Sequence, residues 1–283
     1  MSGSQPIERL TYKETVKEAQ RNLAAFLAAE TGLPKGRIKD AMNKGAVQLK
    51  RGKQTKRARR AETAIQPGDQ VIFHYDAHLL SLKPPMPSCL EDRMGYSVWF
   101  KPAGVMSQGT DFGDHMSMLR IVEKLLDNKR EVFLVHRLDR ETRGLIIIAH
   151  NKKMAAQLSE LFQNGEIKKG YRAIVLGDAP EKETISTPLD DRTAITHIQN
   201  LGFDPERNTS EIDVDLETGR THQIRRHLES IGHPIMGDPR YGQNNKNREG
   251  LQLIAYRLSY QCPMRRDQVN IALPEPFKAK EPS

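Results

Sequence analysis

Apolar side chains recur at intervals of three and four residues in several parts of the chain, which is the spacing of the buried face of a helix. Leu23, Phe26 and Leu27 give one such stripe. Asn151 and Thr221 stand where the N-cap of a helix is expected. Helices are therefore predicted over 13–29, 36–43, 117–126, 152–164 and 222–231.

Short runs of β-branched and large aliphatic residues predict strands. Strict alternation is clearest at Ile212, Val214 and Leu216. Strands are predicted over 46–49, 70–75, 96–100, 132–135, 145–149, 171–177 and 209–217. Helices and strands alternate without regular βαβ spacing, and several hairpins are expected. The fold class is therefore predicted as α+β, with a mainly antiparallel mixed sheet and flanking helices.

A proline-rich stretch divides the chain. It contains Pro84, Pro85 and Pro87, and proline lacks the backbone donor that a helix or a central strand needs. The segment is predicted to be a linker between two domains. The predicted division is a loose terminus over 1–12, a small α/β domain over 13–76, the linker over 77–94, a large domain over 95–262 and a tail over 263–283.

The composition is that of a soluble globular protein. Hydrophobic residues make up 37% and charged residues 28% of the 283 positions, and no apolar run is long enough to cross a membrane. The N-terminus has no apolar signal core, so secretion is not expected. Cys89 and Cys262 form no CxxC pair, which suits a reducing compartment. We expect a cytoplasmic monomer with no membrane partner.

The formal net charge of +8 favours a polyanionic partner. No acidic residue lies between Asp40 and Glu62, whereas basic residues are frequent in and just before this window. A solvated charged face is the alternative interpretation. The candidate RNA-binding residues are Lys35, Arg37, Lys44, Lys50, Arg51, Lys53, Lys56, Arg57, Arg59 and Arg60.

A densely charged segment, 136–144, separates two of the predicted strands. Buried charges are costly unless they are paired, and a solvated loop in which Asp139 pairs with Arg137 or Arg140 would avoid that cost. The segment reads HRLDRETRG and resembles the HRLDxxTSG signature of the RluA-type pseudouridine synthases, whose aspartate is catalytic. The resemblance makes Asp139 the candidate catalytic carboxylate. Arg143 departs from the signature, because the family usually has serine there.

A longer match lies in 216–242, where LETGRTHQIRRHL is followed by GHPIMGD and YG. It resembles the second signature of the same family, TGRxHQIRxHL…GHPIxGDxxYG. The resemblance makes Arg225 the expected partner of Asp139, since a neighbouring guanidinium keeps a carboxylate ionised. The alternative is a surface helix in which Arg225 pairs with Glu229, four residues further on.

The same resemblance assigns further residues to the site. Tyr171 matches the tyrosine that stacks on the flipped uracil, although an ordinary strand aromatic is the alternative. Arg137 matches the residue that probes the space left by the flipped base. Leu253 matches an apolar position of the uracil pocket, but Ile254 replaces the usual histidine after it, and core packing is the alternative for Leu253. The expected catalytic residues are Asp139, Tyr171 and Arg225, and the expected substrate-binding residues are Arg137, Leu253, His136 and Thr142.

The resemblance implies an RNA pseudouridine synthase with the fold of that family, which flips a uridine out of its stack and isomerises it. An isomerisation needs no cofactor or metal, and none is expected. His222, His227 and His233 lack the spacing of a helical zinc pair, and no GxGxxG, P-loop or GxSxG motif occurs.

The small N-terminal domain resembles the alpha-L RNA-binding domain named after a small-subunit ribosomal protein. The order helix, helix, strand, basic stretch, strand carries this resemblance. Such a domain is commoner in relatives that act on large-subunit ribosomal RNA, so rRNA is favoured over tRNA as the partner. One alternative is a non-catalytic RNA-binding or ribosome-assembly factor, which Arg143 and Ile254 would favour. Another is a glycoside hydrolase, which would need a second acid such as Asp238 or Glu217.

Overall fold

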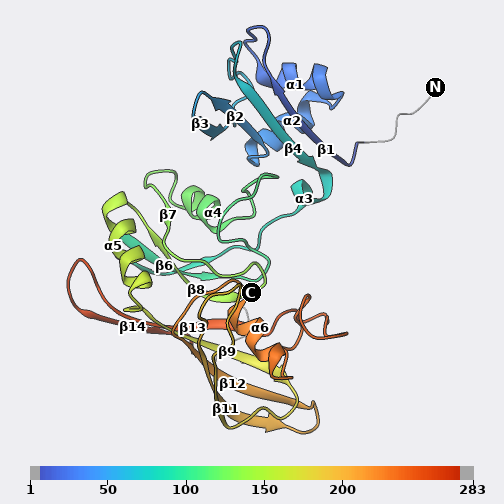
Figure 1. Cartoon of the computed structure of the whole chain (residues 1–283). Coiled ribbons are helices and arrows are strands. Elements are labelled where there is room, and N and C mark those ends of the chain that lie inside the picture. The colour runs from blue at the N-terminus through green and yellow to red at the C-terminus, as the bar shows by residue number, and fades with distance from the viewer. Residues whose placement is uncertain (1–6, 275–283) are drawn as a thin grey trace. The chain divides into compact units, whose positions relative to one another are not determined.

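The computed structural model describes residues 7–274, and the chain divides into two compact units. Unit 1 is the chain up to Pro84 together with Gln108–Lys124. Unit 2 is Pro85–Ser107 together with the chain from Leu125 onward. Figure 1 labels the elements of both units in chain order.

Unit 1 contains an antiparallel sheet with the strand order β1-β4-β2-β3. Leu27, Ile38 and Phe73 are fully buried in one cluster that joins its helices to its sheet. The strands are β1 (Arg9–Thr15), β2 (Val47–Arg51), β3 (Gln54–Arg57) and β4 (Gln70–Asp76). The helices are α1 (Leu23–Thr31), α2 (Lys35–Asn43) and the short α3 (Ala77–Ser81).

The helix predicted over 13–29 is wrong in its first half. It begins only at Leu23, because the side chain of Asn22 caps it by accepting a hydrogen bond of 2.8 Å from the backbone N–H of Ala25. The residues before it form β1 instead, which takes in part of the predicted loose terminus and pairs with β4 along its whole length. Leu10 alternates with polar neighbours there, which is a strand pattern.

Residues 108–116, called the docking loop below, pack against the rest of unit 1. The carboxylate of Asp114 lies 3.2 Å from Nε of Arg57 and accepts a hydrogen bond from Arg59. The backbone N–H of Asp114 donates to the carbonyl of Lys44 at 2.9 Å. Two of the predicted RNA-binding arginines therefore share one carboxylate within the unit.

The described part of unit 2 contains a ten-stranded mixed sheet. Its main path runs β10-β11-β12-β9-β13-β8-β6-β5, with β14 paired to β13 and β7 paired to β8. The pairing of β8 with β13 is parallel and the others are antiparallel, so the predicted fold class is confirmed. The strands are β5 (Ser88–Asp92), β6 (Tyr96–Lys101), β7 (Phe133–Leu134), β8 (Arg143–Ala149), β9 (Lys168–Leu176), β10 (Lys182–Ile185), β11 (Thr196–Asp204), β12 (Thr209–Leu216), β13 (Leu253–Gln261) and β14 (Gln268–Ala272).

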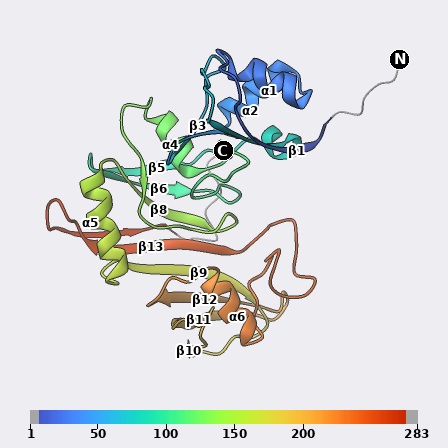
Figure 2. The same ribbon diagram turned by 45° about the horizontal axis from the view of Figure 1, so that its top comes forward.

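The longer helices of unit 2 lie against this sheet. Figure 2 shows α5 beside β8 and α6 beside β11 and β12. The predicted N-cap Asn151 is confirmed, since its side chain accepts from the backbone N–H of Met154 at 2.8 Å. The predicted N-cap Thr221 is wrong, because the cap residue is His222, with a left-handed backbone. The helices are α5 (Lys152–Gln163) and α6 (Gln223–Ser230), while α4 (Met118–Leu125) spans the boundary between the units.

The predicted linker and tail both contain regular structure. The linker over 77–94 includes α3 and β5, and β5 pairs only with β6 at the edge of the sheet, where nearby prolines remove no ladder bond. The tail over 263–283 includes β14, and 275–283 lie outside the described residues. Residues 108–124, placed in the large domain by the sequence, pack with unit 1.

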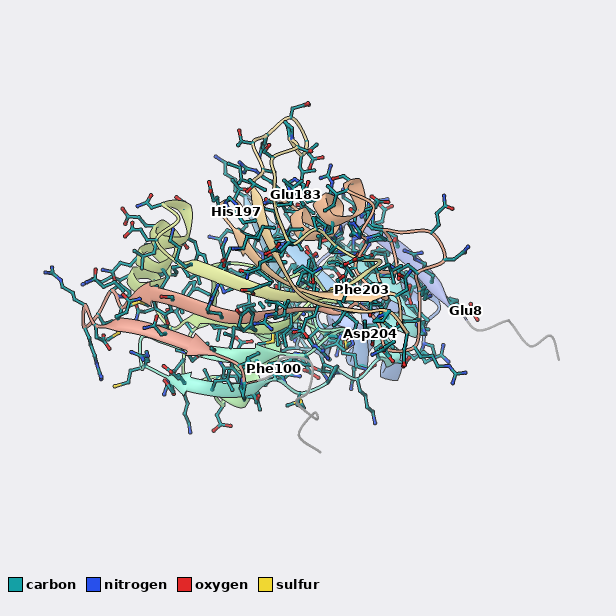
Figure 3. The ribbon with its side chains drawn as sticks, turned by 90° about the horizontal axis from the view of Figure 1, so that it is seen from below. Glu8, Phe100, Glu183, His197, Phe203 and Asp204 are labelled. Atoms are coloured by element: carbon teal, nitrogen blue, oxygen red, sulfur yellow. The ribbon has the colours of Figure 1, made fainter. Side chains whose placement is uncertain are left out.

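The second half of β11 is mostly exposed, and it pairs with β12 as far as Asp204. His197 lies near the start of this strand, and Phe203 and Asp204 lie at its exposed end (Figure 3). No helix in the described part of the chain is long and apolar enough to cross a membrane.

Candidate active site

The last residue of β6 and the turn that follows it hydrogen-bond to the backbone of the loop between β7 and β8. The buried ammonium of Lys101 donates to the carbonyls of Val105 at 2.6 Å and Arg140 at 3.1 Å. The hydroxyl of Ser107 donates to the carbonyl of Leu138 at 2.7 Å and accepts from the N–H of the same residue at 3.0 Å. Burial lowers the pKa of Lys101 to about 7. These bonds hold the backbone on both sides of Asp139.

Arg225 links two carboxylates. Its Nη1 donates to Oδ2 of Asp139 at 3.3 Å, while its Nε and Nη2 donate to the two oxygens of Asp238 at 2.7 and 2.8 Å. The side chain of Arg225 is 2% exposed and that of Asp139 is 18% exposed. This pairing is the one the family resemblance implied, and the alternative pairing of Arg225 with Glu229 is wrong.

The two buried partners stabilise each other's charge. Burial lowers the pKa of Arg225, but the hydrogen bonds and charge of Asp238, with the charge of Asp139, outweigh burial and raise it. Burial raises the pKa of Asp238, but hydrogen bonds from Arg225 and from the backbone of Arg240 and Tyr241 outweigh burial and lower it. Asp238 is thereby committed to Arg225, and Asp139 is the carboxylate left facing the pocket.

His222 and Tyr241 approach Asp139 from another side. The imidazole Nε2 of His222 lies 3.7 Å from Oδ2 of Asp139, and its Nδ1 lies 3.1 Å from the hydroxyl of Tyr241. The guanidinium of Arg225 lies 5.1 Å from the centroid of the Tyr241 ring, a cation–π contact. Burial lowers the pKa of His222, and the charges of Arg225 and Arg240 act in the same direction against the charge of Asp139.

All of the expected catalytic and substrate-binding residues line one pocket of unit 2, with a volume of about 600 Å³. The pocket also contains side chains from α5, β9 and the segment that leads into α6. The expected residues on its wall are His136, Arg137, Asp139, Thr142, Tyr171, Arg225 and Leu253.

These residues differ in exposure. Tyr171 and Leu253 are 7% and 3% exposed, and they form an apolar and aromatic wall. Burial raises the pKa of Tyr171 well above its usual value, and the charge of Asp139 adds to this. Arg137, by contrast, is exposed. The pocket therefore combines an apolar wall with a long cationic side chain, Arg137, that is exposed to solvent.

His136 and Thr142 support the wall rather than face solvent. Nε2 of His136 accepts a hydrogen bond of 2.9 Å from the N–H of Ile147, and its ring stacks on Phe162 with centroids 4.3 Å apart. Burial lowers the pKa of His136 to about 3, so the imidazole is neutral. Thr142 is 2% exposed.

Sequence reasoning missed several groups of the pocket. Apart from their places in the second signature, His222 was considered only as a zinc ligand and Asp238 only as a second acid, and neither Tyr241 nor Lys169 was given a role. The motif match could have singled out His222, Asp238 and Tyr241, since all three are letters of the second signature. Lys169 lies two residues before Tyr171 and lines the pocket, and burial lowers its pKa.

The predicted RNA-binding residues lie in unit 1, and the pocket consists of unit 2 residues. Four of the ten are engaged by carboxylates: Arg51 by Asp69 and Lys44 by Asp40, each at 2.7 Å, and Arg57 and Arg59 by Asp114. The other six are all exposed: Lys35, Arg37, Lys50, Lys53, Lys56 and Arg60.

The arrangement supplies a fixed carboxylate, a permanent cation and a wall on which a planar ring could stack. Within residues 7–274, no group of three His, Cys, Asp or Glu side chains is placed to hold a metal ion. The carboxylate of Asp139, held by Arg225, is suited to act as a nucleophile or a base.

Known proteins are similar to this chain over much of its length. Residues 95–230 match the family model described as RNA pseudouridylate synthase. An uncharacterized RNA pseudouridine synthase of Chloroflexus aurantiacus is 32% identical, over 86% of this chain and 83% of that protein. The ribosomal large subunit pseudouridine synthase D of Zymomonas mobilis is 38% identical over 44% of each chain, and the tRNA pseudouridine synthase C of Haemophilus ducreyi is 35% identical over 52% of this chain and 71% of its own.

The fold comparison points the same way. The human RNA pseudouridylate synthase domain containing 1 superposes with a TM-score of 0.58 at 22% identity, over 69% of this chain and 87% of its own. This similarity supports the fold expected from the sequence.

Proposed function

The chain belongs to the RNA pseudouridine synthase family, and we propose that it modifies uridine in large-subunit ribosomal RNA with Asp139 as the reacting carboxylate. One observation carries the proposal for Asp139. Its carboxylate is the partly exposed acid of the pocket that a buried arginine orients, at 3.3 Å. Asp238 is fully enclosed and holds the other side of the same guanidinium.

The reaction is an isomerisation. The bond between C1′ of the ribose and N1 of the uracil breaks, a bond between C1′ and C5 forms, C5 loses a proton and N1 gains one. Atoms and electrons balance without an oxidant, a reductant or a cofactor. Asp139 acts at the ribose, either as nucleophile toward C1′ or as base toward the sugar, and the hydrogen bond from Arg225 orients it for either role.

The uridine must leave its stack before a side chain can reach the ribose. The pocket of about 600 Å³ has room for a flipped nucleoside. Tyr171 offers a stacking surface for the uracil, and Leu253 covers it on the apolar side. Arg137 is exposed and carries a planar guanidinium, which suits it to the space that the base leaves.

The preference for ribosomal RNA rests on unit 1. Its exposed cations, including Lys50 and Lys53 of the β2–β3 hairpin, offer phosphate contacts. The match to a large-subunit synthase supports this choice, and the match to a tRNA synthase makes tRNA the second candidate. We expect the protein to work in the cytoplasm.

Pseudouridine mapping of total RNA from cells with and without the gene tests both parts of the proposal. One site or a few sites in large-subunit rRNA should lose pseudouridine in the deletion strain. The wild-type gene should restore them, and Asp139→Asn should not, although its affinity for RNA should remain.

Loss of a tRNA site instead would replace the ribosomal substrate by the second candidate. Restoration by Asp139→Asn would remove the proposed role of Asp139. An unchanged map would favour a non-catalytic RNA-binding factor, for which the departures Arg143 and Ile254 are the sequence argument.

A further inference from the structure

His222 has a backbone conformation that its side chain disfavours. It precedes α6 with φ of 55° and ψ of 28°, in the left-handed region that favours glycine and asparagine. As the N-cap residue it makes no side-chain capping bond. A residue other than glycine persists in such a conformation only when the surrounding structure fixes it there.

The surroundings of His222 are well fixed on the side of Gln223. The side-chain oxygen of Gln223 accepts from the N–H of Arg220 at 2.9 Å and from the hydroxyl of Thr218 at 2.8 Å. Its amide nitrogen donates to the carbonyl of Ile195 at 2.9 Å. These bonds set the start of α6 and hold the imidazole of His222 toward the pocket rather than toward solvent.

The hydrogen-bond partners of the imidazole determine which nitrogen carries the proton. Tyr241 can donate its hydroxyl hydrogen to Nδ1 of His222, at 3.1 Å. A neutral ring that accepts at Nδ1 carries its proton on Nε2, and Nε2 is the atom that faces Asp139 at 3.7 Å. The array is therefore a donor chain from Tyr241 through His222 toward Asp139.

We propose that His222 is a positioning residue, which helps Arg225 to hold Oδ2 of the Asp139 carboxylate through Nε2–H while Tyr241 fixes the tautomer of the imidazole. This inference rests on the proposed role of Asp139. Arg225 and His222 both approach Oδ2 of Asp139, so the other oxygen, Oδ1, is left for the ribose. The distance of 3.7 Å is slightly longer than a hydrogen bond, as is common in active sites before substrate closes them.

Burial is the largest cause of the lowered pKa of His222, and it favours the neutral form of the ring. Asp139 and Asp238 favour the imidazolium, whereas burial and the guanidinium groups of Arg225 and Arg240 oppose it. A neutral donor can orient Asp139 without neutralising it. An imidazolium beside Arg225 would add a second full positive charge and weaken the carboxylate as a nucleophile or base.

A set of substitutions separates positioning from folding. His222→Gly relieves the left-handed backbone and removes the donor. His222→Gln keeps an N–H group at the position of Nε2, whereas His222→Asn is too short to reach Asp139 and tolerates the left-handed backbone better. Turnover is measured as tritium release from RNA of the deletion strain labelled with [5-³H]uridine, since the C5 proton leaves once per product. RNA affinity and melting temperature are measured on the same proteins.

His222→Gly should lower kcat about 100-fold, with the RNA Kd unchanged and the melting temperature equal or higher. His222→Asn should resemble His222→Gly, and His222→Gln should recover kcat to within about tenfold of the wild type. Tyr241→Phe should lower kcat less than His222→Gly does, because the ring remains and only its tautomer is released.

Several results would overturn the inference. One is a kcat of His222→Gly near that of the wild type. Another is a parallel loss of melting temperature and RNA affinity in that variant, which would indicate a purely structural role. Recovery by Asn but not by Gln would place the useful atom at Nδ1 instead. Asp139→Asn serves as the reference: turnover in that variant would refute the proposed role of Asp139, whereas its inactivity beside an active His222→Gly would refute only this inference.

Discussion

Arg225 decides the electrostatics of the pocket at the scale of single residues. It is 2% exposed, and its three donor nitrogens are divided between Asp238 and Asp139. Asp238 has no exposed side-chain surface. A buried cation of this kind is stable only while its acceptors remain charged and in place.

Asp238→Asn should therefore destabilise the fold by about 3 kcal/mol, because Arg225 would keep its charge and lose its bidentate partner. Urea unfolding followed by circular dichroism measures this change. The matched control is Asp190→Asn, which removes the acid from the exposed pair that Arg226, the next residue, makes. The control should unfold at the wild-type midpoint, and equal midpoints for both variants would contradict the argument.

Individual residues of the site were largely predictable from the sequence, because two signatures fixed Asp139 and Arg225, and shorter family matches gave Tyr171 and Leu253. Asp139, Tyr171, Arg225 and Leu253 all line the pocket. The pairing of Arg225 with both Asp139 and Asp238 was not predictable. Asp238 lies in a loop, and the spacing of apolar residues does not predict the path of a loop. The conformation of His222 was equally hidden, because a left-handed histidine leaves no mark in residue spacing.

The pairing of β8 with β13 is the feature that matters most at the scale of elements. It is the parallel pairing of the sheet, and it joins the strand after Asp139 to the strand that carries Leu253. Gly144 lies at this crossing with φ of 119°, and a Cβ there would lie 2.2 Å from the carbonyl oxygen of Ala255. No side chain fits without separating the strands.

Gly144→Ala should destabilise the protein by about 1–3 kcal/mol and lower turnover, because the displaced strands carry the walls of the pocket. The control is Gly165→Ala, at φ of 71° with no atom within 4 Å of the new Cβ. It should cost about 1 kcal/mol for the backbone alone and leave turnover unchanged. Thermal unfolding and tritium release measure both effects, and equal losses in the two variants would rule out the steric argument.

Elements with a strong apolar pattern were predicted well, and elements defined by their partners were not. The runs that became β8 and β9 could be read directly from the sequence. The first part of β1 was taken for a loose terminus and its last part, 13–15, for helix, because only the pairing with β4 decides the outcome. β5 and β14 lie beside prolines or in a polar tail, where their pairing depends on β6 and β13.

For the whole molecule, the exposed lysines of unit 1 determine the expected salt dependence of RNA binding. Lys50→Gln combined with Lys53→Gln should reduce the slope of log affinity against log salt by about 1.4, since two phosphate contacts are lost. The matched control removes the same charge at Lys13 and Lys17, which lie on and beyond β1 at the opposite edge of the sheet from β3. Filter binding between low and moderate salt measures the slope. Identical slopes for both double variants would show that the β2–β3 hairpin does not contact RNA.

Unit 1 is discontinuous along the chain, because the docking loop and part of α4 belong to it. The polypeptide leaves or enters this unit at residues 84, 107 and 124. A gene fusion that exchanges everything before residue 84 for the same region of a relative would bring a foreign surface against the native Asp114. The arginines that come with the foreign segment would then have to pair with a carboxylate, Asp114, that comes from the other parent. Recombination between relatives should therefore succeed when the segment up to 84 and the segment 108–124 come from one parent, and fail when they come from two.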